Sequence, residues 1–147
     1  MASSARVSAL KTLKVRPHSE FEVRSKLANK KFSREDVDDA INYLYSLDLL
    51  DDRAFTRSWI TYRLARPFGF KRIVQELRQK GVDLHLIDEE LVPFKESFDA
   101  EVVMDLARRR ALRLTGIDPA KRKKRIFDFL LRRGFSHELI YQAIKKL

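Results

Sequence analysis

The sequence predicts an all-α protein made of three tandem three-helix repeats in an elongated array. Its composition is typical of a folded, helix-rich chain, because 44% of the residues are hydrophobic and 35% are charged, while Gly and Pro occur only 4 times each. An apolar pattern with helical spacing occurs three times along the chain. Repeats of about 50 residues bury little surface alone, so we expect neighbouring repeats to share apolar faces.

The first part of the chain contains start and stop signals for three helices joined by short loops. A first helix is predicted over residues 8–14, where two leucines have helical spacing and the Arg16-Pro17 pair ends the helix. Ser19 and Glu22 form a capping box that starts a second helix, which runs to about residue 29. Ser33 starts a third helix that runs to about residue 47.

A longer helix is predicted next, over residues 49–66, and the rest of the chain is organised around it. Asp51 or Asp52 caps its start, and Pro67 with Gly69 ends it. A helix with two apolar faces is usually buried on two sides, so we expect a junction between packed units. The alternative is an amphipathic helix whose aliphatic side chains are partly exposed. The aromatic face holds Phe55, Trp59 and Tyr62, and the aliphatic face holds Ile60 and Leu64.

The repeated apolar pattern has the same offsets of 0, 4, 9, 14 and 18 in all three copies. Its middle residue lies in a turn between two helices, in Lys31-Phe32-Ser33, Gly81-Val82-Asp83 and Gly134-Phe135-Ser136. The last residue of each turn is a good helix N-cap, and the two glycines suit the position after a helix. Lys31 must adopt the glycine geometry at some cost or change it. The fifteen positions are Val23, Leu27, Phe32, Val37, Ile41, Ile73, Leu77, Val82, Ile87, Leu91, Ile126, Leu130, Phe135, Ile140 and Ile144.

The repeats divide the chain into three predicted modules, residues 1–50, 51–95 and 96–147. The helix over 49–66 opens the second module, and a helix over 98–114 opens the third. Val92-Pro93-Phe94-Lys95 is the predicted bend or hinge between these two modules, because proline interrupts a helical pattern there.

Several classes of protein are excluded by what the sequence lacks. It has no cysteine for disulfides or thiolate metal sites, and its three histidines lie far apart. It also has no zinc-protease motif, glycine-rich phosphate loop or nucleophile elbow, so we do not expect an enzyme. No apolar stretch is long enough for a signal peptide or a membrane span, and we therefore expect a soluble, cytoplasmic protein.

Carboxylates gather in three clusters, at residues 35–39, 51–52 and 88–90. The first two clusters lie at predicted helix starts, where acidic side chains stabilise the helix dipole. We interpret the third cluster as a solvated helix face rather than a metal site.

Basic residues are concentrated in the last third of the chain. The formal net charge is +10, and residues 101–147 contribute +8 of it, with 13 basic and 5 acidic side chains. A polyanionic partner should therefore meet this third first. The candidate polyanion-binding residues are Arg108, Arg109, Arg110, Arg113, Lys121, Arg122, Lys123, Lys124, Arg125, Arg132 and Arg133.

The candidate residues differ in how well helix stability explains their positions in the predicted helices. Those in 108–113 and 132–133 lie late in predicted helices, where cations are favoured. The run over 121–125, KRKKR, instead opens the helix that follows Asp118-Pro119, where each cation opposes the dipole by about 0.3–1 kcal/mol. Binding to a phosphate backbone or to an acidic protein surface would explain this run.

The helix, short turn and helix of each repeat also suggest sequence-specific DNA binding, with the third helix of a repeat in the major groove. Acidic residues argue against this in the first two repeats, because the clusters at 35–39 and 88–90 lie on those helices and repel phosphates. Only the third repeat, with Gln142, Lys145 and Lys146, escapes the objection.

Four segments together resemble the RecX family of bacterial recombination regulators. They are RPHSEFEVRSKL (16–27), LDLLDDRAFTRSWITYRL (47–64), FGFKRIVQELRQKGV (68–82) and RRGFS (132–136). The order and spacing of these segments across three repeats make the resemblance specific, and it covers nearly the whole chain.

The resemblance implies tandem three-helix repeats and a protein that binds the RecA filament on DNA. Such a protein restrains the ATP hydrolysis, strand exchange and coprotease activity of RecA, and so acts in recombination, repair and the SOS response. The resemblance also implies no active site and no cofactor. We expect a monomer that contacts the RecA filament and single- or double-stranded DNA without sequence preference, and no membrane. The alternative is a general sequence-independent DNA-binding helical protein.

Overall fold

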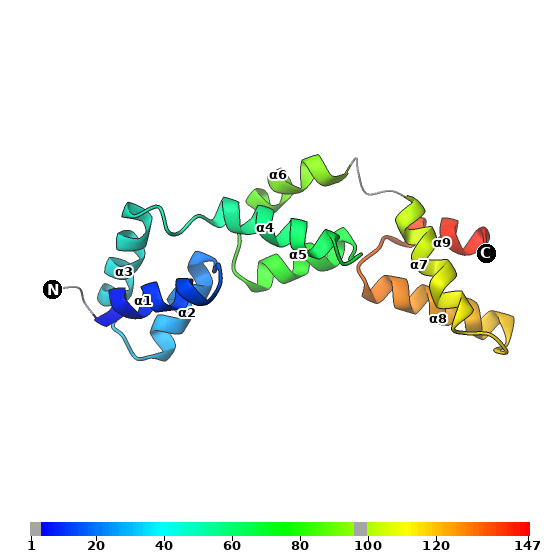
Figure 1. Cartoon of the computed structure of the whole chain (residues 1–147), viewed down its shortest axis with the longest axis horizontal. Coiled ribbons are helices and arrows are strands. Elements are labelled where there is room, and N and C mark those ends of the chain that lie inside the picture. The colour runs from blue at the N-terminus through cyan, green and yellow to red at the C-terminus, as the bar shows by residue number, and fades with distance from the viewer. Residues whose placement is uncertain (1–3, 96–99) are drawn as a thin grey trace. The chain divides into compact units, whose positions relative to one another are not determined.

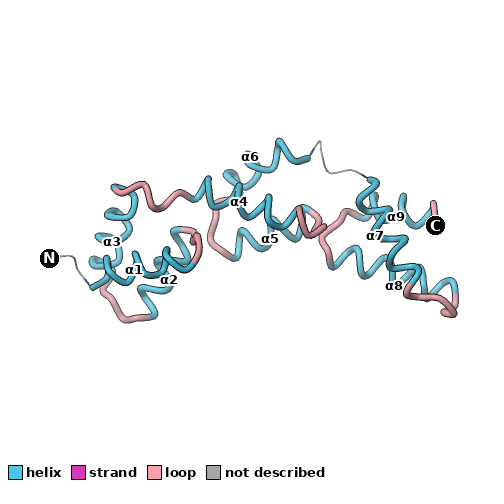
Figure 2. Tube along the Cα trace, viewed as in Figure 1, coloured by secondary structure: helices cyan, strands magenta, loops and turns pink. Residues whose placement is uncertain are grey.

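The computed structural model describes residues 4–95 and 100–147, which form helices joined by short loops (Figures 1 and 2). Within these ranges there are nine helices and no strand, so the predicted all-α class is confirmed. The helices are α1 (Ser4–Val15), α2 (Glu20–Asn29), α3 (Arg34–Ser46), α4 (Asp52–Leu64), α5 (Phe70–Gln79), α6 (Leu84–Lys95), α7 (Ala100–Leu112), α8 (Pro119–Arg132) and α9 (His137–Lys145).

The chain folds into two compact units. One comprises Met1–Trp59 and Leu77–Glu90, and the other comprises Ile60–Glu76 and Leu91–Leu147. The boundary passes through α4, α5 and α6, so the predicted second repeat contributes to both units. The division of the chain at residues 50 and 95 stays a prediction.

The repeated apolar pattern identifies core residues. Thirteen of its fifteen side chains are buried, and the other two, Phe32 and Ile144, are partly buried and pack against a core. One core lies among α1, α2 and α3, and another lies among α7, α8 and α9. The periodicity therefore marks the face that the second and third helices of each repeat bury.

The three turns that contain the middle residue of the pattern have the same backbone. The N–H of that residue donates to the carbonyl five positions earlier, as in a Schellman motif. The N···O distances are 3.3 Å for Phe32 and Leu27, 3.1 Å for Val82 and Leu77, and 3.3 Å for Phe135 and Leu130. Ser33 and Ser136 then cap α3 and α9 by accepting from backbone N–H groups. The predicted helix, turn and helix unit is confirmed.

The first helix is longer than predicted. It begins at Ser4 rather than at residue 8, and it buries small side chains, Ala5, Ser8, Ala9 and Thr12. Leu10 and Leu13 are only partly buried. Small side chains let α1 lie close to α3, and this close packing has no large-apolar periodicity to reveal it.

The long helix predicted over 49–66 is shorter, because α4 spans Asp52–Leu64. Asp51 is its cap, since Asp51 Oδ1 accepts from the backbone N–H groups of Arg53 (3.0 Å) and Ala54 (3.1 Å). The carboxylate of Asp52 points elsewhere and accepts from the Glu20 N–H at 2.8 Å. Asp52 therefore joins the start of α4 to the start of α2.

Burial on two sides of α4 is confirmed only in part. Phe55 and Ile60 are buried, and the rings of Phe55 and Trp59 stack with centroids 6.3 Å apart. The prediction is wrong for Tyr62, which is 45% exposed. Its ring lies under the Arg66 guanidinium at 4.3 Å, so the aromatic side chain packs against a surface cation.

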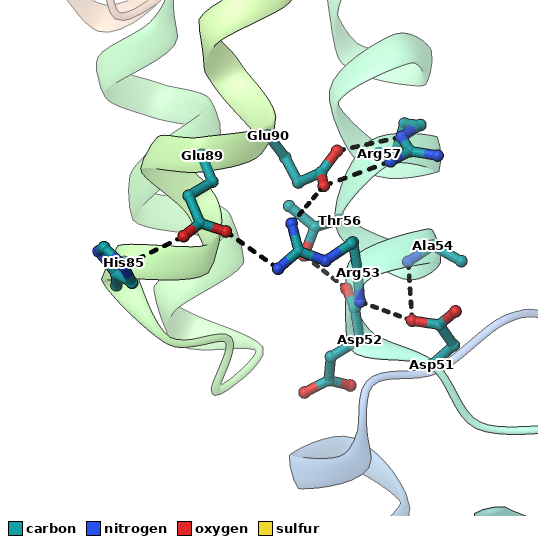
Figure 3. A network of polar contacts seen from close by, with 9 residues as sticks. All are labelled: Asp51, Asp52, Arg53, Ala54, Thr56, Arg57, His85, Glu89 and Glu90. Atoms are coloured by element: carbon teal, nitrogen blue, oxygen red, sulfur yellow. Dashed lines mark hydrogen bonds and ion pairs between the residues drawn. The ribbon is translucent and has the colours of Figure 1, made fainter.

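The acidic cluster at 88–90 is not a fully solvated face. Figure 3 shows Glu89 and Glu90 of α6 directed toward Arg53 and Arg57 of α4. Glu90 is buried and pairs with Arg53 (2.8 Å) and Arg57 (3.0 Å), while Glu89 pairs with Arg53 (2.9 Å). Hydrogen bonds from Arg57 and Arg53 lower the pKa of Glu90. The interpretation as a solvated face is wrong for Glu90, because α6 turns this carboxylate toward the arginines of α4.

The predicted bend at 92–95 is also wrong. These residues form the last turn of α6, with Pro93 inside the helix. Proline removes one backbone hydrogen bond, and near the end of a helix this loss is confined to the final turn. Residues 96–99, which follow, lie outside the described part of the chain.

Candidate functional site

The predicted polyanion-binding residues lie on α7, on α8 and just after them (Figure 1). Arg108, Arg109 and Arg110 are in the last turns of α7, which begins at Ala100 rather than at residue 98. Residues 98 and 99 lie outside the described part of the chain. The run over 121–125 lies in the first turns of α8, where Asp118 caps the helix by accepting from the Lys121 N–H at 3.3 Å.

Four of the candidates come together around a cleft of about 270 Å³. They are Arg109, Arg110, Arg113 and Arg133, and the cleft is also lined by Pro67, Leu106 and Phe129. The C-terminal end of α7 and the C-terminal end of α8 supply the arginines. We name this feature the arginine cleft.

Aromatic rings position the guanidinium groups of the arginine cleft. The guanidinium carbons of Arg110 and Arg133 lie 5.0 Å and 5.1 Å from the centroid of the Phe129 ring. Arg133 also lies 5.1 Å from the centroid of the Phe68 ring. A guanidinium that stacks on a ring keeps its N–H groups at the edge, where they can donate to an anion.

The arginines differ in whether a carboxylate neutralises them. Arg63 and Arg72, which both lie 4.4 Å from the Phe68 centroid, share Glu76, and hydrogen bonding to this carboxylate raises the pKa of Arg63. Most arginines of the arginine cleft, in contrast, are not neutralised by a carboxylate. Arg110, Arg113 and Arg133 have no carboxylate partner among the described residues, while Arg109 forms an exposed pair with Asp105 at 3.0 Å. The arginine cleft therefore has an excess of positive charge.

Sequence reasoning missed the residues at the start of α5 and in the loop before it that complete this region. The Gly69 N–H donates to the Arg133 carbonyl at 2.6 Å, and the Lys71 N–H donates to the Gly134 carbonyl at 3.3 Å. A Cβ on Gly69 would collide with the Gly134 backbone, so this close approach requires glycine. The signal available in the sequence was the presence of Gly69 and Gly134, because the chain has only 4 glycines.

The run over 121–125 forms a separate basic surface. The side chains of Lys121, Lys123, Lys124 and Arg125 are exposed. Arg122 instead donates from its guanidinium to the Ala111 carbonyl at 3.1 Å, near the end of α7. Arg122 therefore holds α8 against α7, and the other four side chains face solvent.

The two remaining candidates lie outside both groups. Arg108 lines a different cleft, of about 490 Å³, together with Glu101 and Asp105. Arg132 is exposed at the end of α8, where its carbonyl accepts from the Arg72 guanidinium at 3.3 Å. The eleven candidates thus form two basic groups and two isolated residues, rather than one continuous site.

The described residues offer neither a metal site nor a membrane-spanning helix. In residues 4–95 and 100–147, no three His, Asp or Glu side chains converge in a way that could hold a metal ion. None of the described helices combines the length and the apolar character that crossing a membrane requires.

Comparison with known proteins gives the same family along the whole chain. Residues 5–44, 51–91 and 99–144 match the first, second and third three-helix domains of RecX. The regulatory protein RecX of Chlorobium limicola is 36% identical over 146 residues, which cover 99% of this chain and 90% of that protein. The regulatory protein RecX of Haemophilus influenzae (strain Rd) is 34% identical over 136 residues, covering 92% and 89%.

Solved structures are similar as well. The crystal structure of RecX from Lactobacillus salivarius superposes with a TM-score of 0.84 at 26% identity, and the match covers 99% of this chain and 96% of that chain. A crystal structure of a regulatory protein RecX also gives a TM-score of 0.84, with 99% of this chain and 72% of that chain covered.

Proposed function

This chain belongs to the RecX family of regulatory proteins, and from that premise we propose that it regulates the RecA recombinase by binding the RecA–DNA filament. In this proposal it is a negative regulator that lowers ATP hydrolysis, strand exchange and coprotease activity. It works in the cytoplasm as a monomer, and it needs neither a cofactor nor catalytic chemistry of its own.

The observation that carries the proposal is the excess of positive charge on the third repeat. Arg110, Arg113 and Arg133 have no carboxylate partner among the described residues, and four more cations of α8 face solvent. Charges of one sign on one surface attract a polyanion and speed its association. A filament that contains nucleic acid offers such a polyanion.

The first two repeats support a different part of the proposed function, which is the contact with RecA. Their charges are largely paired, as in Arg6 with Asp39 (2.8 Å) and Arg53 with Glu90 (2.8 Å). We propose that residues 1–50 and 51–95 contact RecA protomers by shape and apolar surface, while residues 96–147 contact phosphates. Several weak contacts linked in one chain give high avidity, so separating the repeats should cost more affinity than any single substitution.

A second candidate function is general DNA binding, with indirect effects on RecA. The exposed lysines at the start of α8 favour it, because such cations bind any phosphate backbone. The two functions differ in relative affinity. A filament regulator binds the RecA filament more tightly than bare DNA, whereas a general DNA-binding protein does not.

The test is the rate of RecA-dependent ATP hydrolysis on single-stranded DNA, with increasing amounts of this protein. The salt concentration is set so that the protein does not saturate bare DNA. We expect hydrolysis to fall as the protein is added, and the protein alone to hydrolyse no ATP. If hydrolysis is unchanged while the protein still coats free DNA, the regulator proposal is wrong and general DNA binding replaces it.

A further inference from the structure

The arginine cleft is suited to a more specific role than general attraction. Three guanidinium groups with no carboxylate partner surround a concave surface, so they repel one another and concentrate positive potential in the cleft. The Nε of Arg110 is buried and has no hydrogen-bond partner among the described residues. A buried donor of this kind is costly unless a partner accepts from it.

The chemistry of the arginine cleft favours an oxyanion. The guanidinium groups of Arg110 and Arg133 both lie over the Phe129 ring, so this ring is less open to stacking on a nucleobase. The cleft, at about 270 Å³, is smaller than a typical pocket for a drug-sized ligand, which begins at about 300 Å³. Guanidinium groups donate best to charged oxygens, so the cleft favours a phosphate group over a neutral base.

The number of arginines favours a nucleic-acid backbone over an acidic side chain. Two guanidinium groups are enough to bind one carboxylate nearby, where Glu76 accepts from Arg63 and Arg72. A nucleic-acid strand instead offers successive phosphates at short intervals, each with one negative charge shared by two oxygens. Three unpaired guanidinium groups match that arrangement.

We propose that the arginine cleft binds the backbone phosphates of a nucleic-acid strand through Arg110, Arg113 and Arg133. This inference rests on the proposed function and gives the DNA-contacting part of it a defined place. The cleft, rather than the exposed run at the start of α8, then makes the closest phosphate contacts.

The test compares two double variants with the same chemical change. Arg110→Gln with Arg113→Gln alters the arginine cleft, and Arg34→Gln with Arg78→Gln removes two exposed charges from the first two repeats. Binding to fluorescent oligo(dT) is measured by anisotropy from about 50 to 200 mM salt, because the log–log slope reports the number of phosphate contacts. Thermal unfolding followed by circular dichroism checks that each variant is folded.

We expect the cleft double variant to bind at least tenfold more weakly and to lose about 0.7 from the slope for each phosphate contact removed. The control should bind within about threefold of the wild type, since its cations are outside the cleft. Arg113→Gln alone tests the same point if the double variant is unfolded, because Arg113 is exposed and its replacement disturbs no packing.

Two outcomes overturn the inference. Equal losses in the cleft variant and the control would mean that charge acts diffusely, without a defined cleft. Wild-type binding to oligo(dT) by the cleft variant, combined with lost inhibition of RecA, would mean that the cleft binds protein. Loss of oligo(dT) binding with inhibition retained would support the cleft as a phosphate site while showing that inhibition does not depend on it, so the two proposals are tested separately.

Discussion

Lys31, Gly81 and Gly134 occupy the same position in the three turns, and all three have a positive φ, of 70°, 74° and 93°. Lys31 therefore adopts the glycine geometry instead of changing the turn. Close packing also requires glycine at positions 81 and 134, because a Cβ on Gly81 would collide with Phe21 and a Cβ on Gly134 would collide with Arg72. Backbone strain explains a preference for glycine, and close packing explains why only two of the turns require it.

Substitutions at these turns should separate the two effects. We expect Lys31→Gly to raise the free energy of unfolding by about 0.5–1 kcal/mol, because it relieves a left-handed backbone. Gly81→Ala should lower it by about 2 kcal/mol or more, because it adds a collision to the strain. Gly116→Ala is the control, since Gly116 has φ of 79° and no atom within 4 Å of a built Cβ. Urea unfolding measures all three. Equal costs at Gly81 and Gly116 would contradict the packing argument.

The starts of α2 and α5 make equivalent hydrogen bonds, one from a hydroxyl and one from a backbone N–H. The Ser19 hydroxyl donates to the Lys80 carbonyl at 2.5 Å, and the Gly69 N–H donates to the Arg133 carbonyl at 2.6 Å. Ser19 and Gly69 are equivalent in the register of the repeat, and Lys80 and Arg133 are equivalent too. In both cases the start of a second helix binds the turn of the following repeat. A repeated contact of this kind is how neighbouring units stabilise one another in repeat proteins.

The basic run over 121–125 occupies the same place in the third repeat. Arg122 is the equivalent of Ser19 and Gly69, and its guanidinium donates to Ala111 within its own repeat. Cations at this helix start oppose the dipole, yet they do not have to accommodate the close backbone approach seen at Gly69. The start of the second helix therefore carries exposed charge in the third repeat, whereas it makes a packed contact in the first two repeats.

The contact between α2 and the turn at Lys80 should depend on pH through Glu22. Burial alone would raise the pKa of Glu22, but hydrogen bonds from Arg16 and the Ser19 N–H, together with the charge of Lys80, lower it to about 2. A carboxylate with a lowered pKa stabilises the fold above its ordinary pKa of about 4.5 and loses this effect as the pH falls toward 2.

We therefore expect Glu22→Gln to lower the free energy of unfolding by about 1 kcal/mol at pH 7, after allowance for solvent screening. The difference from the wild type should shrink as the pH falls from 5 toward about 2.5. Asp88→Asn, which removes an exposed carboxylate beyond the first turn of α6, serves as the control and should have little effect. Urea unfolding at several pH values measures this. A difference that stays constant with pH would show that the charge of Glu22 is not responsible.

The whole chain is predicted to form an elongated array, because each repeat is too small for a core that is stable alone. Small-angle X-ray scattering tests this prediction. A single compact domain of 147 residues would have a radius of gyration of about 15 Å, and we expect a clearly larger value. A measured value near 15 Å would contradict the array. Scattering at several protein concentrations is the control, because the value for a monomer does not change with concentration.

Much of the candidate site could not be predicted from the sequence. Charge counting identified the third repeat and named Arg109, Arg110, Arg113 and Arg133, but it gave equal weight to Arg108 and Arg132. It could not show that Arg122 binds a carbonyl of α7. Whether a cation is paired depends on which carboxylates the fold brings near it, and sequence spacing does not report that.

The sequence by itself determined the order of the helices, most of their caps and the large apolar residues of the cores, but not the ends of α1 and α4 or the small residues that α1 buries. These features depend on interactions within a few positions, so periodicity, capping residues and turn glycines are enough to predict them. The tertiary structure alone decided that Glu90 is buried against α4 and that Phe68 lies beside Arg133. These contacts join residues far apart in the chain, and they depend on the close packing of helices, which no local pattern encodes.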